Sequence, residues 1–203
     1  MKKIASVISY LLHPLLMPLY CMVLIFYTSN YPAFAVHPRL QLFVFGLVFI
    51  TTLLLPVLSS LFLVYRGEVS SLKMPLREER TMPFFYTACY YVMCYFLMQK
   101  LPMPDIISVS ILGAAISILL ALLINLKWKI SIHMIGIGGV IGMMLGLTHI
   151  IYANYVFGII YFFFLAGLLG TVRIYTTDHK LSQIYAGFFL GVVVEFSALV
   201  FIS

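Results

Sequence analysis

The chain has 203 residues, of which 64% are hydrophobic and only 9% charged, and its mean hydropathy is +1.12. Soluble domains carry about 25% charged residues, so this composition excludes a soluble protein and indicates one that lies in a membrane. The net charge of +6 is not carried by an exposed basic segment with interleaved aromatic residues. We therefore expect no nucleic-acid partner, and anionic lipid headgroups are the natural partner of the cations.

Continuous apolar stretches divide the chain into candidate membrane spans. Strands of a membrane barrel alternate polar and apolar residues, whereas these stretches do not, and each is close to the ~20 residues that a spanning helix needs. We therefore predict an all-α, multi-pass transmembrane bundle of six to seven helices, forming a single integral membrane domain over residues 1–203. The candidate spans are residues 4–29, 40–65, 83–100, 105–126, 133–150, 153–172 and 181–202.

The first span resembles a signal peptide but continues to Tyr27 without a small-residue cleavage site. We interpret it as a retained helix. Pro14 and Pro18 are expected to kink or break it, because proline cannot donate a helical hydrogen bond. His13, which precedes the first of these prolines, is interpreted as a packing or interfacial residue.

Small residues and one carboxylate stand out within the later spans. Gly138, Gly142 and Gly146 recur every four residues, a spacing that favours close packing between helices. Glu195 lies in the middle of the last span, where a carboxylate either has a function or is hydrogen-bonded inside the bundle; both interpretations stay open. Together these features are the only support for a third possibility, a small transporter or channel.

Three polar segments interrupt the apolar sequence, at residues 73–80, 131–133 and 173–183. Two predicted spans separate the first segment from the second, and two more separate the second from the third. An even number of crossings returns the chain to the same side of the membrane. The sequence therefore predicts that the three segments meet at one face.

The third segment contains a candidate nucleophile with a candidate orienting group. His179 and Gln183 are four residues apart and share one face of a helix. A nucleophilic imidazole attacks through one ring nitrogen while an acceptor holds the other. The amide oxygen of Gln183 can serve as that acceptor, although a carboxylate would also stabilise the imidazolium that develops.

The other polar residues suit a phosphate group and its leaving group. His133 is a candidate general acid for a leaving alkoxide. Ser131 and the backbone N–H groups at the start of the following helix can hold phosphate oxygens. The cations Lys73, Arg80 and Arg173 suit the charge on a transferring phosphoryl group.

The order Lys-x6-Arg, Ser-x-His and Arg-x5-His over roughly residues 73–191 resembles the type 2 phosphatidic acid phosphatase (PAP2) superfamily, which also includes the vanadium haloperoxidases. The resemblance implies a PAP2-like core at about residues 66–200. It implies a membrane lipid phosphatase that hydrolyses a phosphate monoester or diphosphate and needs neither a metal nor another cofactor. The implied roles are nucleophile for His179, acid for His133, and phosphate ligands for Lys73, Arg80, Ser131 and Arg173.

The chain also departs from the family's pattern. Gln183 stands where the third motif has Asp, and Ile132 stands where the second motif has Gly. A carboxamide in place of an orienting carboxylate lowers turnover in related catalytic arrangements. The alternative is therefore a catalytically impaired PAP2-like protein that binds phosphorylated lipid or a partner protein.

The expected location is the bacterial inner (cytoplasmic) membrane. Most of the twelve Lys and Arg residues fall on the side of the three polar segments, and the positive-inside rule would place that side in the cytoplasm. The family resemblance implies a site at the outer face. Both orientations stay open.

Overall fold

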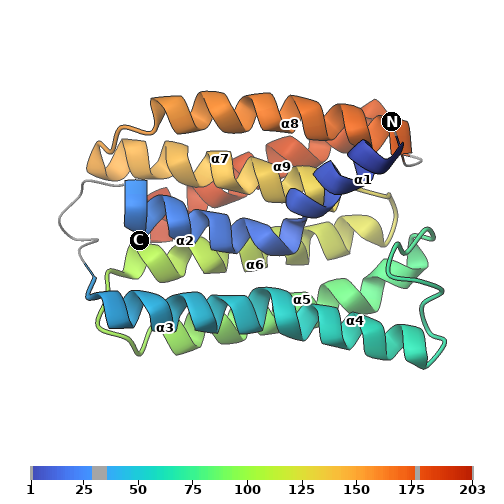
Figure 1. Cartoon of the computed structure of the whole chain (residues 1–203), viewed down its shortest axis with the longest axis horizontal. Helices are drawn as coiled ribbons and strands as arrows, with labels where there is room; N and C mark the ends of the chain where they lie inside the picture. Colours follow the sequence, from blue (N-terminus) through green and yellow to red (C-terminus); the bar gives the residue numbers. More distant parts are fainter. Residues whose placement is uncertain (1, 29–35, 177–178, 203) are drawn as a thin grey trace.

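The structure is a computed structural model that describes residues 2–28, 36–176 and 179–202, and over these residues it contains helices and no strands. The helices pack lengthwise into one bundle (Figure 1). In chain order they are α1 (Lys2–Leu11), η1 (Pro14–Leu16), α2 (Met17–Thr28), α3 (Pro38–Val48), η3 (Phe49–Leu54), α4 (Leu55–Tyr65), η4 (Glu78–Arg80), α5 (Thr81–Met98), α6 (Asp105–Asn125), α7 (Ile132–Ile151), α8 (Val156–Thr176) and α9 (Leu181–Ile202).

The predicted all-α transmembrane bundle is confirmed. Among the described residues, six helical stretches are long and apolar enough to cross a membrane. They are Lys3–Tyr27, Pro38–Tyr65, Asp105–Asn125, Ile132–Ile151, Val156–Thr176 and Leu181–Ile202. The remaining predicted span, residues 83–100, corresponds to α5, which has 18 residues and runs beside the others (Figure 1). Its four tyrosines make it less apolar than its neighbours, because each tyrosine carries a hydroxyl group.

The boundaries of one predicted span are corrected. The span predicted at 153–172 is α8, which starts at Val156 and continues to Thr176. Its start is delayed because the side-chain oxygen of Asn154 accepts a hydrogen bond from the backbone N–H of Val156 at 3.3 Å. Arg173 consequently lies in the last helical turn and not in a loop. The predicted end of the first span, residue 29, lies outside the described residues.

The predicted break in the first span is confirmed at Pro14. Helix α1 ends at Leu11, and the short 3₁₀ turn η1 starts at Pro14 and leads into α2. His13 caps this turn, because its Nδ1 accepts a hydrogen bond from the backbone N–H of Leu15 at 3.3 Å. Proline is well suited to the first position of such a turn, where its missing N–H is not needed.

A π-helical turn, η3, interrupts the second span between α3 and α4. Thr51 and Thr52 are buried there, and their hydroxyl groups donate to the carbonyls of Leu47 and Val48. Pro56, just inside α4, has no N–H to donate to the Thr52 carbonyl one turn earlier. The hydroxyl of Tyr91, on α5, donates to that carbonyl at 3.4 Å.

Helices α7 and α9 are packed closely through glycine, as the sequence predicted. A Cβ atom added at Gly138 would meet the backbone carbonyl of Phe188, and one at Gly142 would meet that of Val192. From the other side, a Cβ atom at Gly191 would meet the carbonyl of Ile135. The absence of side chains therefore lets the two backbones touch, which gives the bundle a rigid centre.

The three polar segments lie at one end of the bundle, together with the start of α1 (Figure 1). The first segment forms the connection between α4 and α5, the second connects α6 to α7, and the third spans the end of α8 and the start of α9. The prediction that they meet at one face is confirmed, because residues from all three line a single cavity.

Candidate functional site

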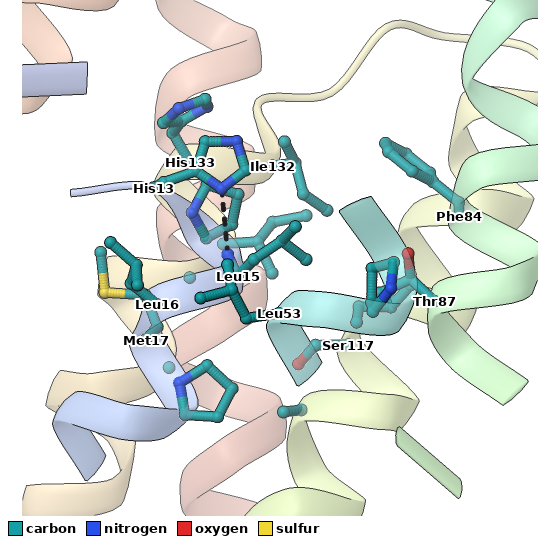
Figure 2. A pocket seen from close by; sticks show the side chains of 18 of the residues that line it. His13, Leu15, Leu16, Met17, Leu53, Phe84, Thr87, Ser117, Ile132 and His133 are labelled. Carbon is teal, nitrogen blue, oxygen red and sulfur yellow. Dashed lines mark hydrogen bonds between the residues drawn. The ribbon is translucent and has the colours of Figure 1, made fainter. Parts of the chain in front are cut away.

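The cavity has a volume of about 620 Å³, within the range that small-molecule sites occupy. At the polar end of the bundle it is lined by Lys73, Arg80, His133, Arg173 and His179. Five of the seven residues predicted for the site therefore come together there. Figure 2 shows that apolar side chains, among them Leu53 and Phe84, line the same pocket as His13 and His133.

Arg80 is held in the wall by its own loop. Its side chain is only 8% exposed, and its Nε donates to the backbone carbonyl of Met74 at 3.1 Å. Met74 adopts a left-handed backbone with φ 46°, a conformation that side-chain-bearing residues rarely take. Burial lowers the pKa of Arg80, while the neighbouring Glu79 acts in the opposite direction. An arginine stays charged at neutral pH in spite of such a shift.

An acidic residue ties the first polar segment together from outside the cavity. The Glu79 carboxylate accepts hydrogen bonds from the backbone N–H groups of Ser70, at 2.8 Å, and Leu76, at 3.2 Å. Hydrogen bonding to Ser70, first through its side chain and then through its backbone, lowers the pKa of Glu79, and the Leu76 bond adds to this effect. Glu79 is therefore ionised at neutral pH. Arg77 is directed to a different partner, since it forms an ion pair with Glu78 at 3.1 Å. Of the cations in this segment, Lys73 and Arg80 are therefore the ones that reach the cavity.

The end of α6 and the connection that follows it hold the first polar segment in place. The side-chain Nδ2 of Asn125, the last residue of α6, donates to the Arg77 carbonyl at 2.9 Å. Four residues later, the Lys129 Nζ donates to the Pro75 carbonyl at 3.4 Å. Residues about fifty positions apart in the sequence thus form one polar layer over the end of the bundle.

His179 is oriented by Gln183, as predicted. The His179 Nδ1 and Gln183 Oε1 are 3.1 Å apart, and Oε1 also accepts from the backbone N–H of Lys180 at 3.0 Å. Because that N–H can only donate, the amide atom facing it must be the oxygen. The same oxygen faces His179, so Nδ1 carries the proton and Nε2 keeps its lone pair. Gln183 thus selects the tautomer in which Nε2 is a nucleophile.

The surroundings of His179 favour its neutral form. Its pKa is lowered from the ordinary 6.5 to about 4, first by burial and then by the positive charges of Arg173, Arg80 and Lys129. The hydrogen bond to Gln183 acts in the opposite direction. The imidazole is therefore unprotonated at neutral pH, in a cationic environment that attracts an anion.

His133 is supported by a part of the chain that is far away in sequence. It is the second residue of α7 and is 9% exposed. The backbone of Ser9, in α1, lies within hydrogen-bonding reach of its ring. The ring of His13 stands nearly perpendicular to it, with centroids 5.3 Å apart, and the two lie side by side in Figure 2. Helix α1 and the histidine that caps η1 therefore support the His133 ring.

Ser131 does not reach the cavity. It precedes α7, is fully buried, and its hydroxyl oxygen has no hydrogen-bond partner among the described residues. Its backbone N–H donates to the Gln183 carbonyl at 3.3 Å. A Cβ atom at Gly187 would lie 2.6 Å from the Ser131 carbonyl oxygen. The close packing of α9 covers this residue, so in this structure Ser131 joins the second and third segments without lining the cavity.

His13 is the cavity residue whose position the sequence analysis missed. The sequence favours a packing or interfacial residue at this position, whereas in the structure His13 lines the cavity beside His133. The signal was present as a histidine directly before the proline that breaks the first span. A histidine at such a position can cap the new turn, as His13 does for η1. Its contact with His133, on a distant helix, could not be predicted from the local sequence.

Comparisons with protein-family models, with curated proteins and with solved structures find no match for this chain. The described residues contain no group of three or more His, Cys, Asp or Glu side chains placed to hold a metal ion. The chemistry of the site therefore has to be argued from its own residues.

Proposed function

We propose that this protein is a membrane-embedded lipid phosphatase that hydrolyses a phosphate monoester or diphosphate through a phosphohistidine intermediate. The observation that carries the proposal is the convergence of two histidines and three cations from separate polar segments on one cavity. The order of these residues, which resembles the PAP2 superfamily, supports the same function. Its expected setting is a bacterial inner membrane.

The proposed first step transfers the phosphoryl group to His179. Its Nε2 lone pair attacks phosphorus, and the bond from phosphorus to the leaving oxygen breaks with its electrons on oxygen. His133, which the step requires to start in its imidazolium form, gives that oxygen a proton and becomes neutral. Lys73, Arg80 and Arg173 offset the negative charge on the other oxygens, which is the main contribution that a protein makes to such a transfer.

The proposed second step returns the enzyme to its starting state. Water attacks the phosphohistidine and gives a proton to His133. The phosphorus–nitrogen bond breaks, its electrons return to His179, and inorganic phosphate leaves. The hydrogen bond from His179 Nδ1 to Gln183 is present throughout and keeps Nε2 as the reacting atom.

The apolar part of the cavity supports a lipid as the carrier of the phosphate. Leu53, Val57, Phe84 and Ile118 line it below the polar end. Such walls take up a hydrocarbon chain without loss of hydrogen bonds. Candidate substrates are phosphatidic acid, phosphatidylglycerol phosphate, a polyprenyl phosphate or diphosphate, and a lipid A-type phosphate.

The test is phosphate release by the purified protein in detergent from a panel of these lipids. His179→Ala is expected to lower the rate by about 10³-fold or more, because it removes the attacking atom. His149→Ala is the matched control. His149 lies in the last turn of α7, whereas His133 lies in the first turn of the same helix, at the polar end of the bundle. Radiolabelled phosphate trapped on the wild type and absent from His179→Ala would identify the intermediate.

A second candidate function is that of a non-catalytic binder of phosphorylated lipid or of a partner protein. It is favoured by one observation, that the side chain hydrogen-bonded to the His179 ring is the neutral amide of Gln183. It requires no phosphate release from any lipid of the panel, together with lipid phosphate binding that Arg80→Ala weakens. Release that His179→Ala abolishes would exclude it.

A further inference from the structure

The interior end of the cavity contains two polar groups that the proposed reaction does not use. Ser117 on α6 and Glu195 on α9 both line the cavity and are 4% and 3% exposed. The Ser117 hydroxyl oxygen and Glu195 Oε1 have no hydrogen-bond partner among the described residues. A buried polar group without a partner is costly, so this pair calls for an occupant that can bond to it.

Glycines make room for the carboxyl group. A Cβ atom added at Gly113 of α6 would lie 2.5 Å from Glu195 Oε2, and one at Gly142 of α7 would lie 3.1 Å from the Glu195 Cβ. The side chain of Glu195 therefore lies against bare backbone where three helices meet. Ser117 is one helical turn from Gly113 on the same face of α6. We call Ser117 and Glu195 the interior polar pair.

The position of the interior polar pair along α6 gives its depth. Asn125, at the end of α6, contacts the first polar segment through the Arg77 carbonyl. Ser117 and Gly113 precede Asn125 by eight and twelve residues. At a rise of 1.5 Å per residue they lie about 12 and 18 Å from the polar end. The interior polar pair is therefore well inside the hydrocarbon core, which is about 30 Å thick.

We propose that the interior polar pair is a second binding subsite, which takes a hydroxyl group carried on the hydrocarbon chain of an amphiphile whose anionic head lies at the cationic end. A hydroxyl both donates and accepts, so it can bond to a serine and a carboxyl group together. It also enters a membrane interior at far lower cost than a charged group. This inference rests on the proposed function, because it takes the phosphate to lie among Lys73, Arg80 and Arg173.

The test uses alkyl phosphonates, whose carbon–phosphorus bond is not hydrolysed, in matched pairs that end in a methyl or a hydroxyl group. Affinity for the purified protein in detergent is measured by calorimetry over a series of chain lengths. The hydroxyl is expected to raise affinity about three- to tenfold, and only for chains that span about 12 to 18 Å. Shorter chains should show no gain.

Variants test whether Ser117 and Glu195 are the source of the gain in affinity. Ser117→Ala and Glu195→Leu are expected to remove it, while Glu195→Gln keeps a hydrogen-bonding group of equal size and keeps most of it. Ser110→Ala is the matched control, because Ser110 lines the same cavity from α6 but already donates to the Ile107 carbonyl at 2.8 Å. Thermal unfolding of each variant in detergent checks that it is folded.

The outcomes separate this inference from the proposed function. Equal affinity for methyl and hydroxyl chains at every length would overturn the subsite alone and would leave water as the partner of the pair. Stronger binding of an amino-terminated chain would overturn the hydroxyl assignment in favour of an ionised carboxylate. Failure of every alkyl phosphonate to bind would overturn the phosphate site and the subsite together.

Discussion

The two histidines of the site are supported in different ways. His179 is held by Gln183, one turn away in its own segment. His133 lies against a distant part of the chain, the backbone of Ser9 in α1 and the ring of His13 at the start of η1, more than a hundred residues away in sequence. The support of His179 can therefore form as soon as α9 folds. That of His133 exists only when α1 and η1 have packed beside α7.

This difference separates the local part of the site from the part that depends on the whole bundle. Substitution of a local support acts on one hydrogen bond and should change chemistry without changing packing. Substitution of a distant support acts on the position of α1 as well.

Removal of the acceptor at Gln183 should have the largest effect. Gln183→Leu leaves no atom to hold the proton on His179 Nδ1, so we expect kcat to fall by about 10²- to 10⁴-fold, the range seen when an orienting acceptor is lost. Gln183→Glu keeps the length of the side chain and both hydrogen bonds and adds charge. It should give activity equal to or above wild type, measured as phosphate release.

Gln183→Asp tests how far the acceptor has to reach. Its carboxylate is one methylene shorter, and Gln183 Oε1 bonds to both His179 and Lys180. We expect activity at least equal to wild type if the Asp carboxylate still reaches the ring. A clear loss in both acidic variants, with unchanged thermal unfolding, would contradict the orienting role of Gln183.

Substitution of His13 should have a smaller effect, of about tenfold on kcat, because it loosens His133 without removing it. His13→Asn keeps a side-chain oxygen that can cap η1 but lacks the imidazole edge, and His13→Ala lacks both. We expect the alanine variant to be less stable than the asparagine variant. Both should alter the basic limb of the pH–rate profile, which reports the general acid.

His37 provides a matched control for this prediction. It also precedes a proline and caps the following helix, with its Nδ1 accepting from the backbone N–H of Arg39 at 3.3 Å. It lies at the start of α3 and does not line the cavity. His37→Ala should therefore leave kcat unchanged. An equal loss of activity in both alanine variants would show that helix capping, and not contact with His133, is what matters.

The smallest expected effect concerns pH and stability. The folded-state pKa of His179 is about 4, below the ordinary value of about 6.5 for an unfolded chain. Between these values the unfolded state binds a proton that the folded state does not, so the free energy of unfolding falls as pH falls from about 6.5 to 4. Between pH 7 and pH 4 the midpoint temperature of thermal unfolding should fall by a few degrees more for wild type than for His179→Ala.

Much of the fold could be predicted because the membrane restricts the choices. Continuous apolar stretches of the right length specify helices, the break at Pro14 follows from proline chemistry, and the glycine spacing of α7 indicated close packing. The start of α8 was misplaced because the bond from Asn154 to Val156 leaves no periodic signal. The π-helical turn in the second span was also not predicted, since its cause lies partly in contacts with α5.

The candidate site was predictable where its contacts are local. The pair His179 and Gln183 follows from a spacing of four residues. The meeting of the three polar segments follows from counting crossings. The burial of Ser131 and the position of His13 could not be predicted, because both depend on how closely distant helices approach. Gly187 lets α9 cover Ser131, and the turn at Pro14 brings His13 to His133.

The bond between Tyr91 and the Thr52 carbonyl has a consequence for how the cavity keeps its shape. In a membrane interior no water is present to bond to an exposed carbonyl. A carbonyl left without a donor by proline therefore needs a hydrogen-bond donor from another helix. The Tyr91 hydroxyl is that donor, and both Tyr91 and Pro56 line the cavity. The N–H group that Pro56 lacks thus leaves a carbonyl that Tyr91 of α5 can bond to, and this bond sets the spacing of two cavity walls.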